Sequence, residues 1–257
     1  MGTIPGQFRW LGAFFLATCL LVLAASANFL APPEVQDTRL EAGNFGVHVR
    51  MEGPYAAEVP LQIVCYFKYH PEQHGRAQEG RAEKSRMSGA PVELDRRLGG
   101  AIAALRERGE FVGDELETLL LVPPSGSIPA KLLLLIGLGE ESQLSLDTMQ
   151  RVGRTALREA TRLGVSRAAF APQIRDQGNA TLPAGEVARA VVRGALLAYG
   201  TQERLAREGL ARPLALTEWT MQAGPKYYDE TVAGVKRGIQ QAQTQSAQRP
   251  PAKRAQE

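Results

Sequence analysis

The chain has 257 residues, of which 22% are charged, and a formal net charge of +3. Its basic residues are spread among acidic ones, apart from a small basic cluster at 249–254, so the concentrated basic stripe of a nucleic-acid-binding protein is missing and no nucleic-acid partner is expected. The length suits one domain that buries its own core.

Residues 1–27 have the pattern of a secretory signal peptide. Arg9 precedes a short apolar run over 10–24, and Ala25-Ser26-Ala27 then forms a small-residue cleavage site. A transmembrane helix needs about 20 apolar residues, so a permanent anchor is the less favoured alternative. We therefore expect an exported protein, periplasmic or secreted, that touches a membrane only through this segment if it stays uncleaved.

In chain order, the apolar periodicity predicts strands at 45–51 and 61–69, a helix at 92–108, strands at 116–122 and 131–138, a helix at 145–163, a strand at 165–171, a helix at 184–200, a strand at 214–221 and a helix at 227–241. Ser145 and Gly164 are typical of the start and end of a helix. The alternation predicts the α/β class, with one domain built on a mixed, largely parallel sheet flanked by helices.

The domain is predicted to span 45–240. Residues 28–44 before it are polar and contain prolines, which is typical of a linker. Residues 241–257 are rich in Gln, Ala and Pro without apolar periodicity, which predicts a disordered tail. Cys65 lies in an apolar strand, so we expect a buried, unreactive thiol.

The most site-like feature is the Gly137-Leu138-Gly139 turn after the apolar strand. Glycines there let a backbone approach a phosphate at the start of a helix. Ser142 stands where a dinucleotide motif needs its third glycine, and Glu140 would repel an anion. Gly137 and Gly139 are therefore a candidate ligand-binding loop, with an ordinary tight turn as the alternative.

No catalytic residue, metal ligand set or cofactor is predicted. His70 and His74 have the spacing of a zinc pair, but Pro71 disfavours a helix between them and no third ligand is near. His48 lies in a strand without an identifiable partner, and no Gly-x-Ser-x-Gly motif occurs.

A helix with Leu-Asp and Leu-Gly-Gly at 94–101 is followed by Gly-Glu-Phe-Val-Gly at 109–113 and by a strand that ends Ile-Gly-Leu-Gly at 136–139. Further segments that share this pattern are 151–156, 163–165, 186–199 and 233–241. Their order and spacing, over about residues 47–241, resemble the N-terminal domain of the leucyl (cytosol) aminopeptidase family.

The resemblance implies a fold similar to macro domains, with a mixed sheet between helices. In that family, peptide cleavage belongs to a C-terminal domain where lysine, aspartate and glutamate side chains hold two metal ions. Its motif, similar to Asn-Thr-Asp-Ala-Glu-Gly-Arg, does not occur in this sequence, which stops where that domain would begin. The resemblance therefore transfers no catalytic residue, which favours a non-catalytic chain and leaves an enzyme as the alternative.

Three hypotheses for the function follow. The first is a non-catalytic exported protein that acts in assembly, as a homo-oligomer or with a protein partner. The second is a macro-like domain that binds a small, nucleotide-like ligand, which rests on fold analogy. The third is a metallo-aminopeptidase by homology, or a subunit of a split aminopeptidase, which would need metal ligands from elsewhere.

Overall fold

The computed structural model describes Gly2 and residues 35–71 and 87–248, with a compact unit that begins at Asp37. The predicted signal peptide, His74 and the end of the predicted tail lie outside the described residues. In the described part of the chain, every helix is too short or too polar to cross a membrane.

A seven-stranded mixed sheet forms the centre of the described domain, in the order β1-β2-β7-β6-β3-β5-β4. The strands are β1 (Asp37–Ala42), β2 (Phe45–Arg50), β3 (Leu61–Tyr66), β4 (Thr118–Leu121), β5 (Leu132–Gly137), β6 (Arg167–Ala171) and β7 (Glu218–Gln222). All pairs from β2 across to β5 are parallel, and only β1 and β4 at the two edges pair antiparallel. The predicted class, a mixed and largely parallel α/β sheet, is confirmed.

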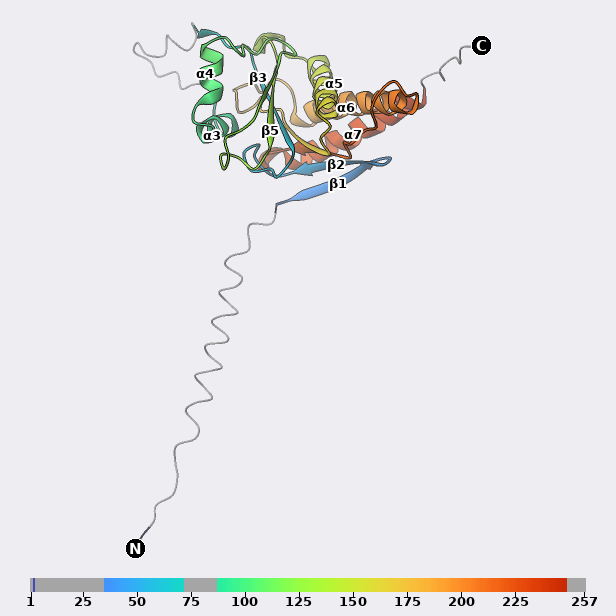
Figure 1. Cartoon of the computed structure of the whole chain (residues 1–257), viewed down its shortest axis with the longest axis horizontal. Coiled ribbons are helices and arrows are strands. Elements are labelled where there is room, and N and C mark those ends of the chain that lie inside the picture. The colour runs from blue at the N-terminus through green and yellow to red at the C-terminus, as the bar shows by residue number, and fades with distance from the viewer. Residues whose placement is uncertain (1, 3–34, 72–86, 249–257) are drawn as a thin grey trace. The chain divides into compact units, whose positions relative to one another are not determined.

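Helices cover the two faces of the sheet (Figure 1). The helices are α3 (Ala90–Arg97), α4 (Ala101–Glu107), α5 (Leu146–Leu163), α6 (Ala184–Arg207) and α7 (Tyr228–Ala247), with short 3₁₀ turns η2 (Glu141–Gln143) and η3 (Pro225–Tyr227). The larger hydrophobic core lies between the sheet and α5, α6 and α7, and it includes Val47 and Trp219. The smaller core lies under α3 and α4 on the other face and includes Leu94 and Tyr66. Cys65 is buried and free, as expected.

Glycines set the spacing of the three helices on the larger face. A Cβ atom at Gly153 of α5 would collide with the main chain of α6 at Val191, and one at Gly194 of α6 would collide with α5 at Gln150. A Cβ atom at Gly234 of α7 would likewise collide with the main chain of α6. Close backbone contact of this kind needs glycine, and it holds α6 firmly between its two neighbours.

Both ends of α5 lie where the sequence predicts them. Ser145 is the N-cap of α5 and accepts a hydrogen bond from the Thr148 amide, 3.1 Å away. Gly164 closes the same helix in the left-handed conformation, with φ of 68°. Both predictions are confirmed.

The predicted single helix at 92–108 is wrong, because the chain forms α3 and α4 with a break between them. Gly99 and Gly100 have φ of 67° and 80°, which ends α3. Asp95 then accepts a hydrogen bond from the Ile102 amide at 2.8 Å and caps the start of α4.

Both predicted domain boundaries need correction. The predicted linker at 28–44 contains β1, whose Leu40 and Ala42 pack on the larger core while Asp37, Arg39 and Glu41 lie on the opposite side. Apolar periodicity does not reveal β1, because this strand is short, carries several charged residues and lies at the edge of the sheet. The predicted tail from 241 begins too early, since α7 continues to Ala247.

Candidate ligand-binding pocket

A cavity of about 580 Å³ opens at the carboxyl ends of β2, β6 and β7. The segments that follow these strands, 51–55, 171–176 and 221–227, form most of its lining, and α6 and α7 complete the wall. We call this cavity the carboxyl-edge pocket. Parallel strands bring their carboxyl ends to one edge of a sheet, so three segments distant in sequence meet there.

The walls of the carboxyl-edge pocket are apolar and aromatic. Ile174, Val187 and Met221 are buried in its lining. Tyr55 and Tyr227 are half-buried, and each carries a cation over its ring: the Arg97 guanidinium carbon lies 4.7 Å from the centre of Tyr55, and that of Arg175 lies 4.6 Å from the centre of Tyr227. Such contacts hold the rings in place.

Gln173 is the unusual polar residue of the pocket. It is only 5% exposed, yet neither its side-chain oxygen nor its side-chain nitrogen has a hydrogen-bond partner. Its φ is 53°, a left-handed conformation that residues other than glycine rarely adopt. A buried amide without partners destabilises a fold by roughly 1–3 kcal/mol, so its presence in a pocket is a sign of function.

Glu52 is a second residue of the lining with a polar atom that lacks a hydrogen-bond partner. Its Oε1 atom is buried without a partner. Burial raises the pKa of this carboxyl group, while the charge of Arg50 and a hydrogen bond with Gln222 oppose the rise. Gln222 in turn accepts a hydrogen bond from Gln62 Nε2 at 2.8 Å, so a chain of buried amides fixes the side of the pocket near Glu52.

Asp176 is the third polar group, and burial also raises the pKa of its carboxyl group. Its main-chain oxygen accepts a hydrogen bond from Ser88 at 2.7 Å, which attaches the segment before α3 to the pocket rim. Carboxyl groups with perturbed pKa values gather at functional sites more often than elsewhere. Glu52 and Asp176 therefore add to the case that this cavity is the site.

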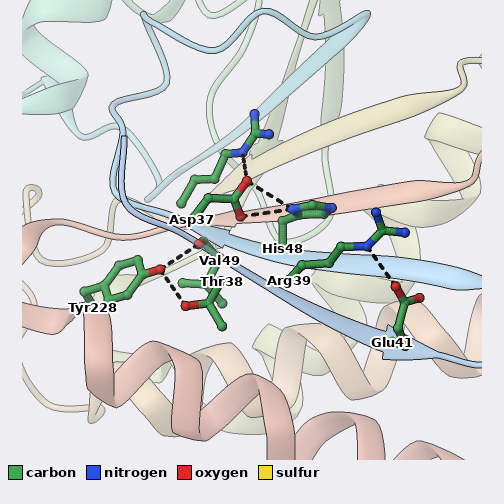
Figure 2. Close-up of polar contacts among 8 residues, drawn as sticks. Asp37, Thr38, Arg39, Glu41, His48, Val49 and Tyr228 are labelled. Atoms are coloured by element: carbon green, nitrogen blue, oxygen red, sulfur yellow. Dashed lines mark hydrogen bonds and ion pairs between the residues drawn. The ribbon is translucent and has the colours of Figure 1, made fainter. Parts of the chain in front are cut away.

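A second polar cluster lies at the β1–β2 edge. Figure 2 shows Asp37 pointing toward His48, whose Nδ1 lies 2.9 Å from the carboxylate, and Arg50 Nε donates to the same carboxylate at 2.8 Å. Tyr228 Oη donates to the Val49 oxygen at 3.1 Å. Burial raises the pKa of Asp37, but the hydrogen bonds from His48 and Arg50 outweigh it and hold that pKa below the usual value. These contacts fasten the edge strand β1 to its neighbours.

The predicted loop at Gly137 and Gly139 lies at the carboxyl end of β5, outside the lining of the carboxyl-edge pocket. The amides of Gly137, Leu138 and Gly139 donate to main-chain oxygens of Glu117, Tyr66 and Gly113 at 2.8–2.9 Å. A Cβ atom at Gly137 would collide with the main chain of Asp114. The main-chain amides of both glycines are thus bonded within the fold. Ligand binding at this loop stays a prediction.

The two described histidines pair with carboxylates. His70 Nε2 lies 2.8 Å from Glu140, and His48 pairs with Asp37. Within residues 35–71 and 87–248, no three His, Cys, Asp or Glu side chains are grouped to hold a metal ion.

The sequence prediction missed Glu52, Gln173 and Asp176. A signal for two of them was present, because Glu52 follows β2 by two positions and Gln173 follows β6 by two positions. Polar residues just beyond the ends of parallel strands are the usual position of ligand contacts. Their lack of partners, however, is visible only in three dimensions.

The structure defines an α/β domain with a mixed sheet and a cavity at the carboxyl ends of its parallel strands. Residues 75–206, about half of the chain, match the model of the cytosol aminopeptidase family, N-terminal domain. The chain therefore belongs to this family, as the resemblance predicted.

Curated relatives are similar over part of their length. The chain is 36% identical over 138 residues to a probable cytosol aminopeptidase of Roseiflexus castenholzii, a match that covers 52% of this chain and 27% of the relative. A probable cytosol aminopeptidase of Geotalea uraniireducens is 34% identical over 93 residues, covering 36% and 19%. The matches thus span about a quarter or less of these relatives.

Solved structures share the fold. A tomato leucine aminopeptidase mutant superimposes with a TM-score of 0.54 at 18% identity, covering 83% of this chain and 38% of that one. An Oceanobacillus iheyensis macrodomain mutant with ADPR superimposes with a TM-score of 0.53 at 11% identity, covering 80% and 100%. The predicted macro-like fold is therefore confirmed.

The raised pKa of Glu52 predicts a pH-dependent effect of Glu52→Gln on stability. At pH 7 the ionised carboxylate is costly in the folded state, so the variant should unfold about 2 °C higher than the wild type. Below about pH 3 the carboxyl group is protonated in both the folded and unfolded states, and the gain should vanish. Thermal unfolding of the full chain at both pH values measures this.

The matched control is Glu58→Gln, which changes an exposed carboxylate outside the pocket lining and should barely shift the Tm. A Glu52→Gln variant that loses stability at pH 7 would show that Glu52 supports the fold rather than the pocket.

Proposed function

We propose that this domain binds a small organic ligand in the carboxyl-edge pocket and has a binding role rather than a catalytic one. The observation that carries the proposal is the cavity of about 580 Å³ at the carboxyl ends of β2, β6 and β7. Small-molecule sites have volumes of roughly 300–1,000 Å³, apolar walls and a few well-placed polar groups. In sheets with parallel strands, they form at this edge.

A nucleotide-like ligand is the class we propose first. Macrodomains of this fold have been solved with ADP and with ADPR. Tyr55 and Tyr227 add aromatic rings to the lining, against which a planar base can pack. Lys226, exposed in the lining, offers an ammonium group to a phosphate. The argument from the shared fold is an analogy, which makes ADP-ribose the first probe to use.

We also propose that peptide hydrolysis, the activity in the names of the relatives, does not reside in this domain. The family model that matches describes their N-terminal domain, and the matched part is about a quarter of the Roseiflexus relative. A subunit that works beside a separate catalytic chain is the alternative. We also propose that the protein is exported, because residues 1–27 have the pattern of a signal peptide. N-terminal sequencing of the mature protein tests this.

The proposal predicts that ADP-ribose binds the full chain saturably in calorimetry. Ala184→Trp should weaken this binding at least tenfold, because Ala184 is half-buried in the pocket lining and an indole there takes up the ligand's space. The control Leu210→Trp, at an exposed position outside the lining, should bind as the wild type does.

The same wild-type preparation should not hydrolyse leucine-p-nitroanilide when zinc or manganese is added. Flat titrations with ADP-ribose and with other nucleotides would remove the nucleotide proposal. Chelator-sensitive turnover would instead place catalysis in this chain.

Assembly is a second candidate function, and the β4 edge of the sheet favours it. Leu120 in β4 is 37% exposed, and Val122, directly after the end of β4, is 78% exposed. The only described pairing of β4 is with β5. Exposed apolar residues on an unpaired strand edge promote pairing with another chain. We propose this edge as the contact of a homo-oligomer.

If the β4 edge joins two copies, the double variant Leu120→Lys, Val122→Lys should shift the protein from dimer to monomer in light scattering, because charged side chains oppose edge pairing. Leu210→Lys, which changes an exposed leucine outside the sheet, is the matched control and should leave the mass unchanged. A wild type that is monomeric at high concentration would remove this candidate.

A further inference from the structure

We propose that the carboxyl-edge pocket recognises its ligand through a planar edge that carries an N–H donor beside an acceptor, paired with the carboxamide of Gln173 and with the carboxylate of Glu52. A nucleobase edge and a primary amide share this chemistry. The inference rests on the proposed binding function and names the ligand class that the pocket selects.

The carboxamide of Gln173 requires two partners at once. Its oxygen accepts and its nitrogen donates, and both atoms are buried without a hydrogen-bond partner. A ligand edge with a donor and an acceptor side by side satisfies both atoms in one planar pair, as glutamine does with adenine. A hydrocarbon, a carboxylate or a phosphate would leave at least one of them unsatisfied.

Gln177 provides an internal comparison within the same segment. Gln173 and Gln177 are each 5% exposed. The Gln177 side chain is fully used: it accepts from the Phe67 amide at 3.0 Å and donates to the Cys65 oxygen at 2.9 Å. Gln177 Nε2 also donates a hydrogen bond to the main-chain oxygen of Gln173 at 3.2 Å. One glutamine therefore fixes the segment. Both polar atoms of the other are shielded and unpartnered, so the Gln173 side chain has to turn toward the cavity to pair with a ligand.

Glu52 adds a second acceptor to the pocket. Gln222 bonds the Glu52 carboxyl group from one side, while Oε1 is buried and unpartnered. This oxygen suits a further N–H of the ligand, such as an amine or amide hydrogen. The same negative charge repels anionic groups, so a phosphate or carboxylate of the ligand is directed away from Glu52 and toward Lys226.

Two matched pairs of probes test the inference by calorimetry on the full chain. Adenosine is compared with purine riboside, which lacks the exocyclic amine. Leucinamide is compared with leucine methyl ester, which keeps the ammonium group and the carbonyl but lacks the amide N–H. In at least one pair, the member with the N–H group should bind about tenfold or more tightly, since a buried polar site rejects an analogue that cannot pair with it.

Gln173→Leu should abolish the preference, because leucine keeps the approximate volume and offers no hydrogen bond. Its Tm should equal or exceed that of the wild type, since the Gln173 side-chain nitrogen and oxygen have no hydrogen-bond partner that the substitution would remove. Glu52→Gln is the second variant and should reduce the preference without loss of folding. Gln143→Leu, an exposed glutamine outside the pocket lining, is the matched control and should keep the preference.

The outcomes separate the inference from the proposed function. Equal affinity within both pairs, or a preference that persists in Gln173→Leu, overturns the inference even where Ala184→Trp blocks binding. Absence of saturable binding by any probe, ADP-ribose included, or binding that Ala184→Trp leaves unchanged, overturns the proposed pocket and the inference with it.

Discussion

Parallel pairing across β2, β7, β6, β3 and β5 is the constraint on which the rest of the structure depends. It directs the carboxyl ends of these strands to one edge, so the segments after β2, β6 and β7 meet although they are far apart in sequence. The glycine contacts of α6 with α5 and α7 then place α6 as a firm wall beside them. The pocket is a consequence of strand direction and helix spacing.

The buried polar groups of the carboxyl-edge pocket lower the free energy of unfolding of the domain. Gln173 is buried without partners in a left-handed conformation, and burial raises the pKa of Glu52 and Asp176. Gln177, which lies four residues after Gln173 and is equally buried, is fully bonded. Unfavourable groups gathered at one cavity are typical of a site whose partner is a ligand, because the fold alone does not need them.

The sequence predicted the fold class and several boundaries because those depend on local signals. Ser145 and Gly164 act within one helix turn, and apolar periodicity located the central strands. Where local signals compete, prediction failed: Gly99 and Gly100 divide an apolar stripe that looked continuous, and β1 is too charged to stand out. The site could not be predicted, because the lack of partners at Gln173 depends on contacts between distant segments.

The most direct test of the account is the side-chain amide resonance of Gln173, followed by NMR while ADP-ribose is added to ¹⁵N-labelled protein. If the pocket uses this carboxamide, the Gln173 resonance shifts and its hydrogens exchange more slowly at saturation, while that of Gln177 changes little. A Gln173 resonance that stays unchanged while the ligand saturates the protein would contradict the account.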